Sequence, residues 1–294
     1  GLGDVYKRQE PLSERLELLR EYASRSNEAS LRRAARYYGL CTRRDTAEVV
    51  LRRAGACDTL RVATVPYGNV SPLYDPAQLT QPPFRLLADS VGYIYAGTFS
   101  REHLAEVGQT LPRTRALIID LRTYPLNVAD ALIALIGQSL RTEPVVAWQM
   151  VHPTLALPGL FFRQEQWIYE GFGEEAKRCA EPYKGRVILL VNELTQSNPE
   201  FQAMALQRCP QTLTIGSPTS GADGDIVRIP LPGGLMTCFS GIGVFYPDGT
   251  PTQAVGVRLD VEVNDTVESL QAGRDLVLEK ALELASGDLS LIHI

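Results

Sequence analysis

A strand that runs directly into a helix places a serine where acyl-transfer enzymes carry a nucleophile. The stretch RVILLVNELTQSNPEFQAMALQ extends from Arg186 to Gln207, and Ser197 stands at the junction. A serine there is exposed at the carboxyl edge of a sheet, and the free N–H groups of the helix start can hold a developing oxyanion. The pattern Ser-Asn-Pro-Glu, with Glu200 three residues after the serine, is also typical of an ordinary helix cap. The local sequence leaves both interpretations open.

A serine nucleophile needs a base that takes its proton. His103 is predicted on the polar side of a helix, and His152 lies in a proline-bounded loop. A lysine with a pKa lowered by burial is the alternative base. Lys177, Lys184 and Lys280 are all predicted at the surface or at helix ends. The sequence therefore shows no evident partner for the serine.

A polar, glycine-rich loop, GSPTSGADGD (residues 216–225), directly follows a predicted strand. It suggests phosphate or metal binding only superficially, because no G-K-[ST] follows and the spacing of a calcium loop is absent. We expect the loop to border a substrate site through Thr219, Gly221 and Asp223.

A second charged cluster, DLRTYP (residues 120–125), ends another buried strand. We expect Asp120 and Arg122 to form a structural ion pair there.

Bulk composition excludes several classes of protein. The 294 residues are 45% hydrophobic and 21% charged, an ordinary globular mixture, and the net charge of −5 argues against a general nucleic-acid binder. The longest apolar runs are strand-sized, so no membrane span is predicted. The cysteines are widely spaced, which favours buried free thiols over a zinc site or a disulfide framework. They are Cys41, Cys57, Cys179, Cys209 and Cys238.

The elements that must position these residues alternate between buried strands and helices after residue 91. This alternation predicts an α/β fold with a mainly parallel sheet covered by helices on both faces. Strands are expected at VGYIYAGTF, RALIIDLRTYP, EPVVAWQMV, RVILLVNE and QTLTIGSP, and helices at ADALIALIGQSL, PEFQAMALQRC and GRDLVLEKALELA. A strand pair or a meander is expected around a turn at Gly233 and Gly234.

Both ends of the chain look foreign to the fold. Residues 1–9 and 288–294 resemble translated sequencing-adapter read-through, and the chain does not begin with Met. We therefore expect both segments to be artefacts and do not count His293 as a catalytic residue. For the same reason, the lack of a signal peptide says nothing about localisation.

Taken together, the motifs resemble those of the C-terminal processing (tail-specific) serine peptidase family, which includes the tricorn core protease. VGYIYAGTF, ALIIDLRTYP, GRVILLVNELTQSNPEFQAMALQ, IGSPTSGADG and the closing segment PDGTPTQAVGVRLDVEV match the family in order, and the resemblance covers about residues 12–284. The DLRTYP, TQS and GADG variants look most like the tricorn-like branch of Bacteroidetes-type bacteria. The resemblance implies a ClpP/crotonase-like peptidase core.

The resemblance also assigns roles to individual residues. Ser197 matches the family nucleophile, and the backbone N–H groups of Asn198 and Leu126 match the oxyanion hole. Many members have Gly-Gly where this chain has Leu126 and Asn127; a backbone donor does not require glycine. Ala222 stands where Ser-Lys members carry the lysine base.

The tricorn-like branch takes its base from a histidine before the regulatory PDZ domain. The resemblance therefore implies that this histidine lies upstream of the present chain. The acidic residue that orients it in that branch falls near Gln253, an amide that can fix an imidazole tautomer without supplying a full charge.

The expected domains follow from the same comparison. Residues 10–66 resemble the C-terminal part of a PDZ-like, β-rich domain, residues 67–84 form a Pro-rich linker, and residues 85–287 form the peptidase core.

The function that follows is a serine endopeptidase of the periplasm or cell envelope, incomplete in this chain, acting on unfolded or C-terminally recognised polypeptides without a metal or organic cofactor. The alternative is a non-catalytic protein that keeps the fold and binds peptides or apolar ligands. A crotonase-like acyl-transfer enzyme is a weaker third possibility, based on fold analogy alone.

Overall fold

The computed structural model describes most of the chain, in ten segments. They are residues 11–53, 55–66, 80–87, 90–125, 132, 136, 146–153, 160–168, 183–209 and 211–287, with the backbone alone for 53, 146–153 and 161–168. None of the described helices combines the length and the apolar character that a membrane crossing demands.

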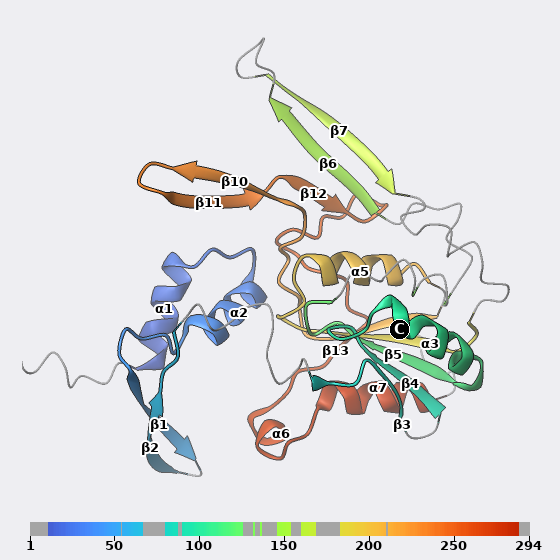
Figure 1. Ribbon diagram of the computed structural model, residues 1–294, viewed down its shortest axis with the longest axis horizontal. Coiled ribbons are helices and arrows are strands. Elements are labelled where there is room, and N and C mark those ends of the chain that lie inside the picture. Colours follow the sequence, from blue (N-terminus) through green and yellow to red (C-terminus); the bar gives the residue numbers. More distant parts are fainter. Residues whose placement is uncertain are drawn as a thin grey trace, which may run out of the picture.

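The core is a six-stranded, mainly parallel sheet in the order β13-β9-β8-β5-β4-β3 (Figure 1). Its strands are β3 (Phe84–Leu87), β4 (Val91–Tyr95), β5 (Ala116–Asp120), β8 (Arg186–Val191), β9 (Thr212–Gly216) and β13 (Val261–Glu262). All neighbours are parallel except β3, which runs antiparallel to β4 at one edge. The parallel pairing brings the carboxyl ends of β5, β8 and β9 to one edge of the sheet. The predicted mixed fold with a mainly parallel sheet is confirmed.

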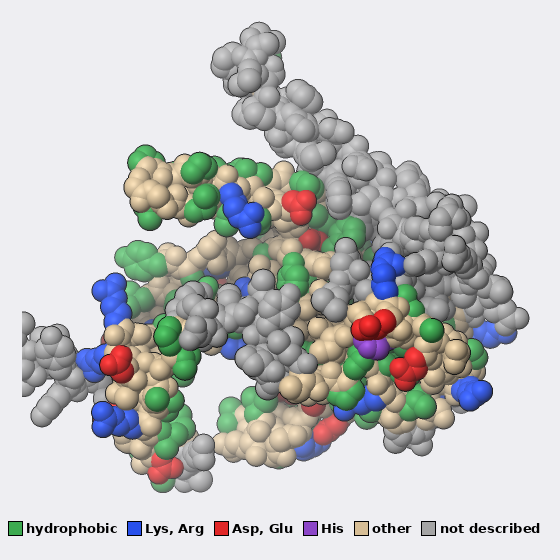
Figure 2. All heavy atoms as spheres, in the orientation of Figure 1, with side chains coloured by type: hydrophobic (Ala, Val, Ile, Leu, Met, Phe, Trp, Pro, Cys, Tyr) green, Lys and Arg blue, Asp and Glu red, His purple; other side chains and the backbone are tan. Residues whose placement is uncertain are grey.

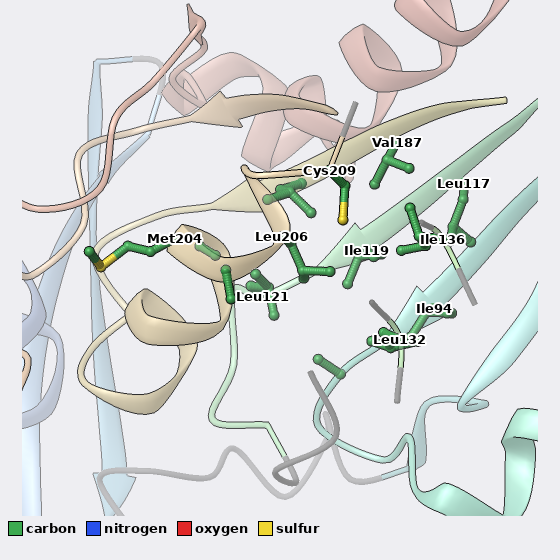
Figure 3. Packing of buried hydrophobic residues seen from close by; sticks show 14 of the residues in the cluster. Ile94, Leu117, Ile119, Leu121, Leu132, Ile136, Val187, Met204, Leu206 and Cys209 are labelled. Carbon is green, nitrogen blue, oxygen red and sulfur yellow. The ribbon is translucent and has the colours of Figure 1, made fainter. Parts of the chain in front are cut away.

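Helices cover both faces of this sheet, because its central strands are buried along their whole length. Side chains alternate between the faces. Leu117 and Ile119 pack with Leu206 of helix α5 (Asn198–Leu206) on one face, as Figure 3 shows. Ile118 packs with Val277 of helix α7 (Leu276–Ser286) on the other face.

Shorter helices complete the core. They are η4 (Arg101–His103), α3 (Leu104–Thr110), η5 (Leu111–Arg113) and α6 (Val267–Gln271). Of the helix predicted at ADALIALIGQSL, only residues 132 and 136 are described, and both are helical and buried.

Two antiparallel sheets project from the core. β10 (Ile226–Leu231) and β11 (Leu235–Ser240) form the predicted strand pair, with Gly233 and Gly234 at its turn in the left-handed region (φ 80° and 75°). Hydrophobic side chains lie exposed along this hairpin (Figure 2). β12 (Ile242–Phe245) pairs with β6 (Val146–Pro153), which pairs with β7 (Phe161–Ile168).

The N-terminal part consists of two helices and a hairpin. They are α1 (Leu12–Tyr22), α2 (Glu28–Tyr38), β1 (Thr46–Arg53) and β2 (Ala56–Ala63). The PDZ-like identity of residues 10–66 and the domain boundaries stay predictions. Most of the linker expected at 67–84 lies outside the described residues.

The cysteines differ from the expectation of buried thiols. Cys209 is buried, and burial raises the pKa of its thiol to about 12. Cys41, Cys57 and Cys238 are exposed; Cys57 and Cys238 lie on strands β2 and β11, whose residues are all exposed. The prediction was therefore wrong for three of the four described cysteines; Cys179 lies outside the described residues.

Candidate active site

Ser197 lies between β8 and α5, at the edge where the central parallel strands end. Its backbone has φ 64° and ψ −120°, a conformation that residues with a side chain rarely adopt. Such a conformation costs about 1–3 kcal/mol and persists only where the surrounding structure holds it. A sharp, strained turn from strand to helix is the geometry that presents a serine hydroxyl above a sheet edge.

Glu200 contacts Ser197 as the capping pattern predicts, because the Ser197 N–H donates to Glu200 Oε2 at 3.0 Å. The pair has the arrangement of a capping box, yet the serine hydroxyl makes no capping hydrogen bond. The N–H of Glu200 donates instead to the carbonyl oxygen of Ser197, at 2.8 Å. The backbone of Ser197, and not its hydroxyl, is thus the part engaged in starting the helix.

The Glu200 carboxylate is fully buried and joins the serine turn to the glycine-rich loop. Its Oε1 accepts from the Thr219 hydroxyl (2.6 Å) and the Gly221 N–H (2.7 Å). Its Oε2 accepts from the Ala222 N–H (3.0 Å) in addition to that of Ser197. Burial raises the pKa of Glu200, while these hydrogen bonds act in the opposite direction. Four donors on one buried carboxyl form a rigid link between the two segments.

The glycine-rich loop needs glycine where it leaves β9. Gly216 has φ 130°, and a Cβ there would lie 2.0 Å from the carbonyl oxygen of Val191, so no larger residue fits. Thr219, one of the residues expected to border a substrate site, is fully buried. Its hydroxyl donates to Glu200 and accepts the N–H of Val257 at 3.0 Å. The loop is therefore held from inside by its threonine.

Thr195, which the sequence did not single out, joins three loops at this edge. Its fully buried hydroxyl donates to the Leu121 carbonyl (2.9 Å) after β5 and accepts the N–H of Asn192 (3.1 Å). Its carbonyl accepts the N–H of Ser220 at 3.1 Å. A threonine two residues before the serine, in a polar loop after a buried strand, was the available signal.

Asp223 is buried, with 4% of its surface exposed. Its Oδ1 accepts the N–H of Gly224 at 2.7 Å, whereas its Oδ2 is buried without a hydrogen-bond partner. Burial raises the pKa of Asp223 to about 7, and the nearby charges of Glu200 and Asp225 add to the increase.

Gln253 lies beside Asp223 and contacts backbone groups. Its Nε2 donates to the carbonyls of Asp223 (3.0 Å) and Ile242 (2.8 Å), and its Oε1 accepts the N–H of Val244 (3.0 Å). Both amide N–H donors are therefore occupied. The proposed role in orienting a histidine stays a prediction.

The predicted pairing of Asp120 with Arg122 is present and extends further. Arg122 donates to Asp120 (2.7 Å) and to Asp275 (2.7 Å), which caps α7. The hydroxyl of Tyr93 donates to Asp120 at 2.7 Å. Burial opposes the charge on Arg122, yet the two carboxylates hold its pKa well above the usual range. This network fixes the segment just before residue 126, which itself lies outside the described residues.

The candidate bases are not brought to Ser197 within the described side chains. His103 is half-buried on η4, where its Nδ1 accepts the N–H of Ser100 at 3.0 Å. Lys280 pairs with Glu283 on α7, across the sheet from α5, and Lys184 is exposed. The His152 side chain, like Lys177 and His293, is outside the described part. No group of three or more His, Cys, Asp or Glu side chains in that part could hold a metal ion.

Comparison with known families decides the class of this site. The profile described as Peptidase family S41 matches residues 90–263, more than half of the chain, including β4, β5, β8, the serine turn and the glycine-rich loop. The chain belongs to peptidase family S41. Membership confirms the family expected from the ordered motifs and implies a serine hydrolase.

Solved structures agree with the S41 fold. Mature CPAF aligns with a TM-score of 0.63 at 15% identity, over 96% of this chain and 76% of that one. CPAF complexed with lactacystin aligns with a TM-score of 0.62 at 14% identity, over 94% of this chain and 75% of that one. A protein from Parabacteroides merdae ATCC 43184 that is described as a peptidase aligns with a TM-score of 0.54 at 20% identity, over 69% of this chain and 64% of that one. This S41 chain thus spans less than two thirds of the Parabacteroides structure, and at these identities the likeness shows the fold alone. No curated protein matches the chain.

Proposed function

We propose that this S41 chain carries the core of a serine endopeptidase in which Ser197 forms an acyl-enzyme with a peptide carbonyl. The observation that carries the proposal is the strained backbone of Ser197 (φ 64°, ψ −120°) at the carboxyl edge of the sheet. A serine that served only as a cap would adopt the extended backbone typical of that position and would use its hydroxyl. Here a buried glutamate holds the backbone while the hydroxyl makes no capping bond.

The oxyanion of the tetrahedral intermediate is proposed to bind backbone N–H groups of Asn198 and Leu126. Asn198 is the first residue of α5, where N–H groups have no partner within the helix and the helix dipole favours negative charge. Within the described residues its N–H makes no hydrogen bond. Thr195 supports the arrangement, because it ties the serine turn to Leu121, five residues before the second proposed donor.

The base is proposed to be a histidine imidazole from sequence upstream of this chain. It takes the proton of the Ser197 hydroxyl as the Oγ attacks, and returns it to the leaving amine when the peptide bond breaks. Water then hydrolyses the acyl-enzyme by the reverse sequence.

Unfolded or C-terminally recognised polypeptides are the proposed substrates, and the periplasm or cell envelope is the proposed location. A PDZ-like identity for residues 10–66 would suit recognition of chain ends. These proposals rest on the family and on the motifs that the chain shares with it.

The decisive assay uses the complete gene product and an unfolded, carboxymethylated protein as substrate. Ser197→Ala is expected to abolish cleavage, while Ser286→Ala, a control at the exposed end of α7, retains it. Equal cleavage by wild type and Ser197→Ala would refute the nucleophile. Binding of the substrate without any cleavage by the wild type would instead support the non-catalytic, peptide-binding alternative.

A further inference from the structure

Asp223 presents an unsatisfied carboxylate oxygen inside the protein. Its Oδ2 is buried and has no hydrogen-bond partner, although only 4% of the residue is exposed. Buried polar atoms in folded proteins almost always have a partner, and a buried carboxylate without one is costly. An exception of this kind next to a candidate active site calls for a donor that the described chain does not supply.

The charges around Asp223 indicate what that donor is. The described charges that act on it belong to Glu200 and Asp225, and both are acidic. Glu200 accepts hydrogen bonds from neutral donors, namely three backbone N–H groups and one hydroxyl, and among the described residues no cationic side chain hydrogen-bonds to it. A buried carboxylate oxygen without a partner, with two further carboxyl groups acting on it, favours a cation that donates an N–H.

Asp223 lies in the segment that adjoins the serine turn. The N–H groups of Ser197 and Ala222 both donate to Glu200 Oε2 at 3.0 Å, so the two nitrogens are at most about 6 Å apart. Asp223 is the next residue after Ala222. In serine hydrolases an imidazole ring bridges the nucleophile and an orienting carboxylate over such a short span.

The neighbouring amide of Gln253 is engaged differently. Its two N–H donors hold the carbonyls of Asp223 and Ile242, so it fixes the backbone of Asp223 in place. Ser240 Oγ donates to the same Asp223 carbonyl at 3.1 Å. The backbone of the loop is thus anchored from two sides, while the buried Oδ2 of the carboxylate has no hydrogen-bond partner.

We propose that Asp223 is the positioning residue that accepts an N–H from the imidazole base through Oδ2 and stabilises the imidazolium formed when Ser197 loses its proton. This inference rests on the proposed function of Ser197. It assigns to Asp223 the full negative charge that an amide at position 253 cannot provide.

Free imidazole tests the proposal on the 294-residue chain. A fluorophosphonate reacts with Ser197 by forming an Oγ–P bond and breaking the P–F bond; fluoride leaves, and the hydroxyl proton passes to imidazole. At pH 8 imidazole is expected to raise the labelling rate at least about tenfold, with saturation. 1-Methylimidazole, which accepts a proton but has no N–H for Asp223, is expected to stimulate far less.

Asp223→Asn is expected to remove both the stimulation and the preference for imidazole over 1-methylimidazole. Asp225→Asn, which removes an exposed charge two residues away, keeps both. A merely structural defect would lower the labelling rate equally with imidazole and with 1-methylimidazole, so it would not change their ratio. This ratio can also be measured on the wild type alone if the Asp223 variant folds poorly.

Two results would overturn the inference: a wild-type rate that is independent of imidazole, or equal stimulation of wild type and Asp223→Asn. Labelling that is unchanged in Ser197→Ala would overturn the proposed function itself. The two failures are therefore distinguishable.

Discussion

Glu200 is the residue on which the geometry around Ser197 most depends. Its carboxylate is fully buried and accepts four hydrogen bonds. In a glutamine of the same shape, one oxygen is replaced by an N–H₂ group, which cannot accept a hydrogen bond from these donors. We expect Glu200→Gln to lower the free energy of unfolding by about 2–4 kcal/mol, because buried donors lose their acceptor. Urea denaturation measures this change.

The matched control is Glu279→Gln on α7. Glu279 is exposed and pairs with Arg274, so its loss is expected to cost less than about 0.5–1 kcal/mol. Equal effects of the two substitutions would contradict the central place given to Glu200.

The raised pKa of Asp223 predicts how the stability of the fold changes with pH. Its pKa of about 7 in the folded state exceeds the ordinary value near 4, so the folded state binds this proton more tightly than the unfolded chain does. Stability is therefore lost as pH rises from about 4 to about 7, by up to about 4 kcal/mol.

Asp223→Asn cannot ionise, so it is expected to be more stable than wild type at pH 8 and to lose that advantage toward pH 4. Urea denaturation of both proteins across this range measures the difference. A stability difference between the two proteins that stays constant with pH would contradict the raised pKa of Asp223.

At the scale of elements, the central strands and α5 could be predicted because their signals are local. Continuous apolar runs at β5 and β8 indicate strands buried on both faces, and a Pro-containing start followed by apolar residues indicates α5. β13 could not be predicted, because two residues carry no periodic pattern. The exposure of Cys238 was also missed, because burial of a hairpin depends on what packs against it.

Thr195 couples three of these elements through loops. Thr195→Val keeps the shape but removes the bonds to Leu121 and Asn192, and we expect a loss of about 1–3 kcal/mol and faster hydrogen exchange in the loops after β5 and β8. Thr195→Ser retains the hydroxyl and should recover most of the stability. Unchanged exchange in the valine variant would show that the loops are held by other contacts.

At the scale of the whole molecule, helix α2 contacts the glycine-rich loop and the segment before Ser197. Asn27 caps α2 by accepting the N–H of Ser30 at 2.9 Å, and its Nδ2 donates to the Thr219 carbonyl at 2.9 Å. Arg36 of α2 lies 3.7 Å from Glu193, close to the serine turn. Movement of the N-terminal part can thus reach Glu200 through the loop that both contact.

Asn27→Asp separates the two roles, because it keeps the cap oxygen and removes the donor to Thr219. We expect faster hydrogen exchange at Gly221 and Ala222, and slower labelling of Ser197, with α2 still folded by circular dichroism. Exchange equal to wild type would show that the helices do not stabilise the loop.

The site itself was only partly predictable. The serine turn and the glycine-rich loop were visible as motifs, and Glu200 as a capping partner. Its bonds to Thr219, Gly221 and Ala222 depend on a contact across about 20 residues of chain, which no local pattern reports. Asn27 and Thr219 are 192 residues apart in sequence, so their contact required the structure.

The central claim is that the Ser197 hydroxyl is a nucleophile, and mapping a fluorophosphonate adduct tests it most directly. The complete gene product is labelled, digested and analysed by mass spectrometry, beside Ser197→Ala. We predict one adduct, on Ser197, that is lost in the alanine variant. An adduct on another residue, or equal labelling of both proteins, would contradict the account.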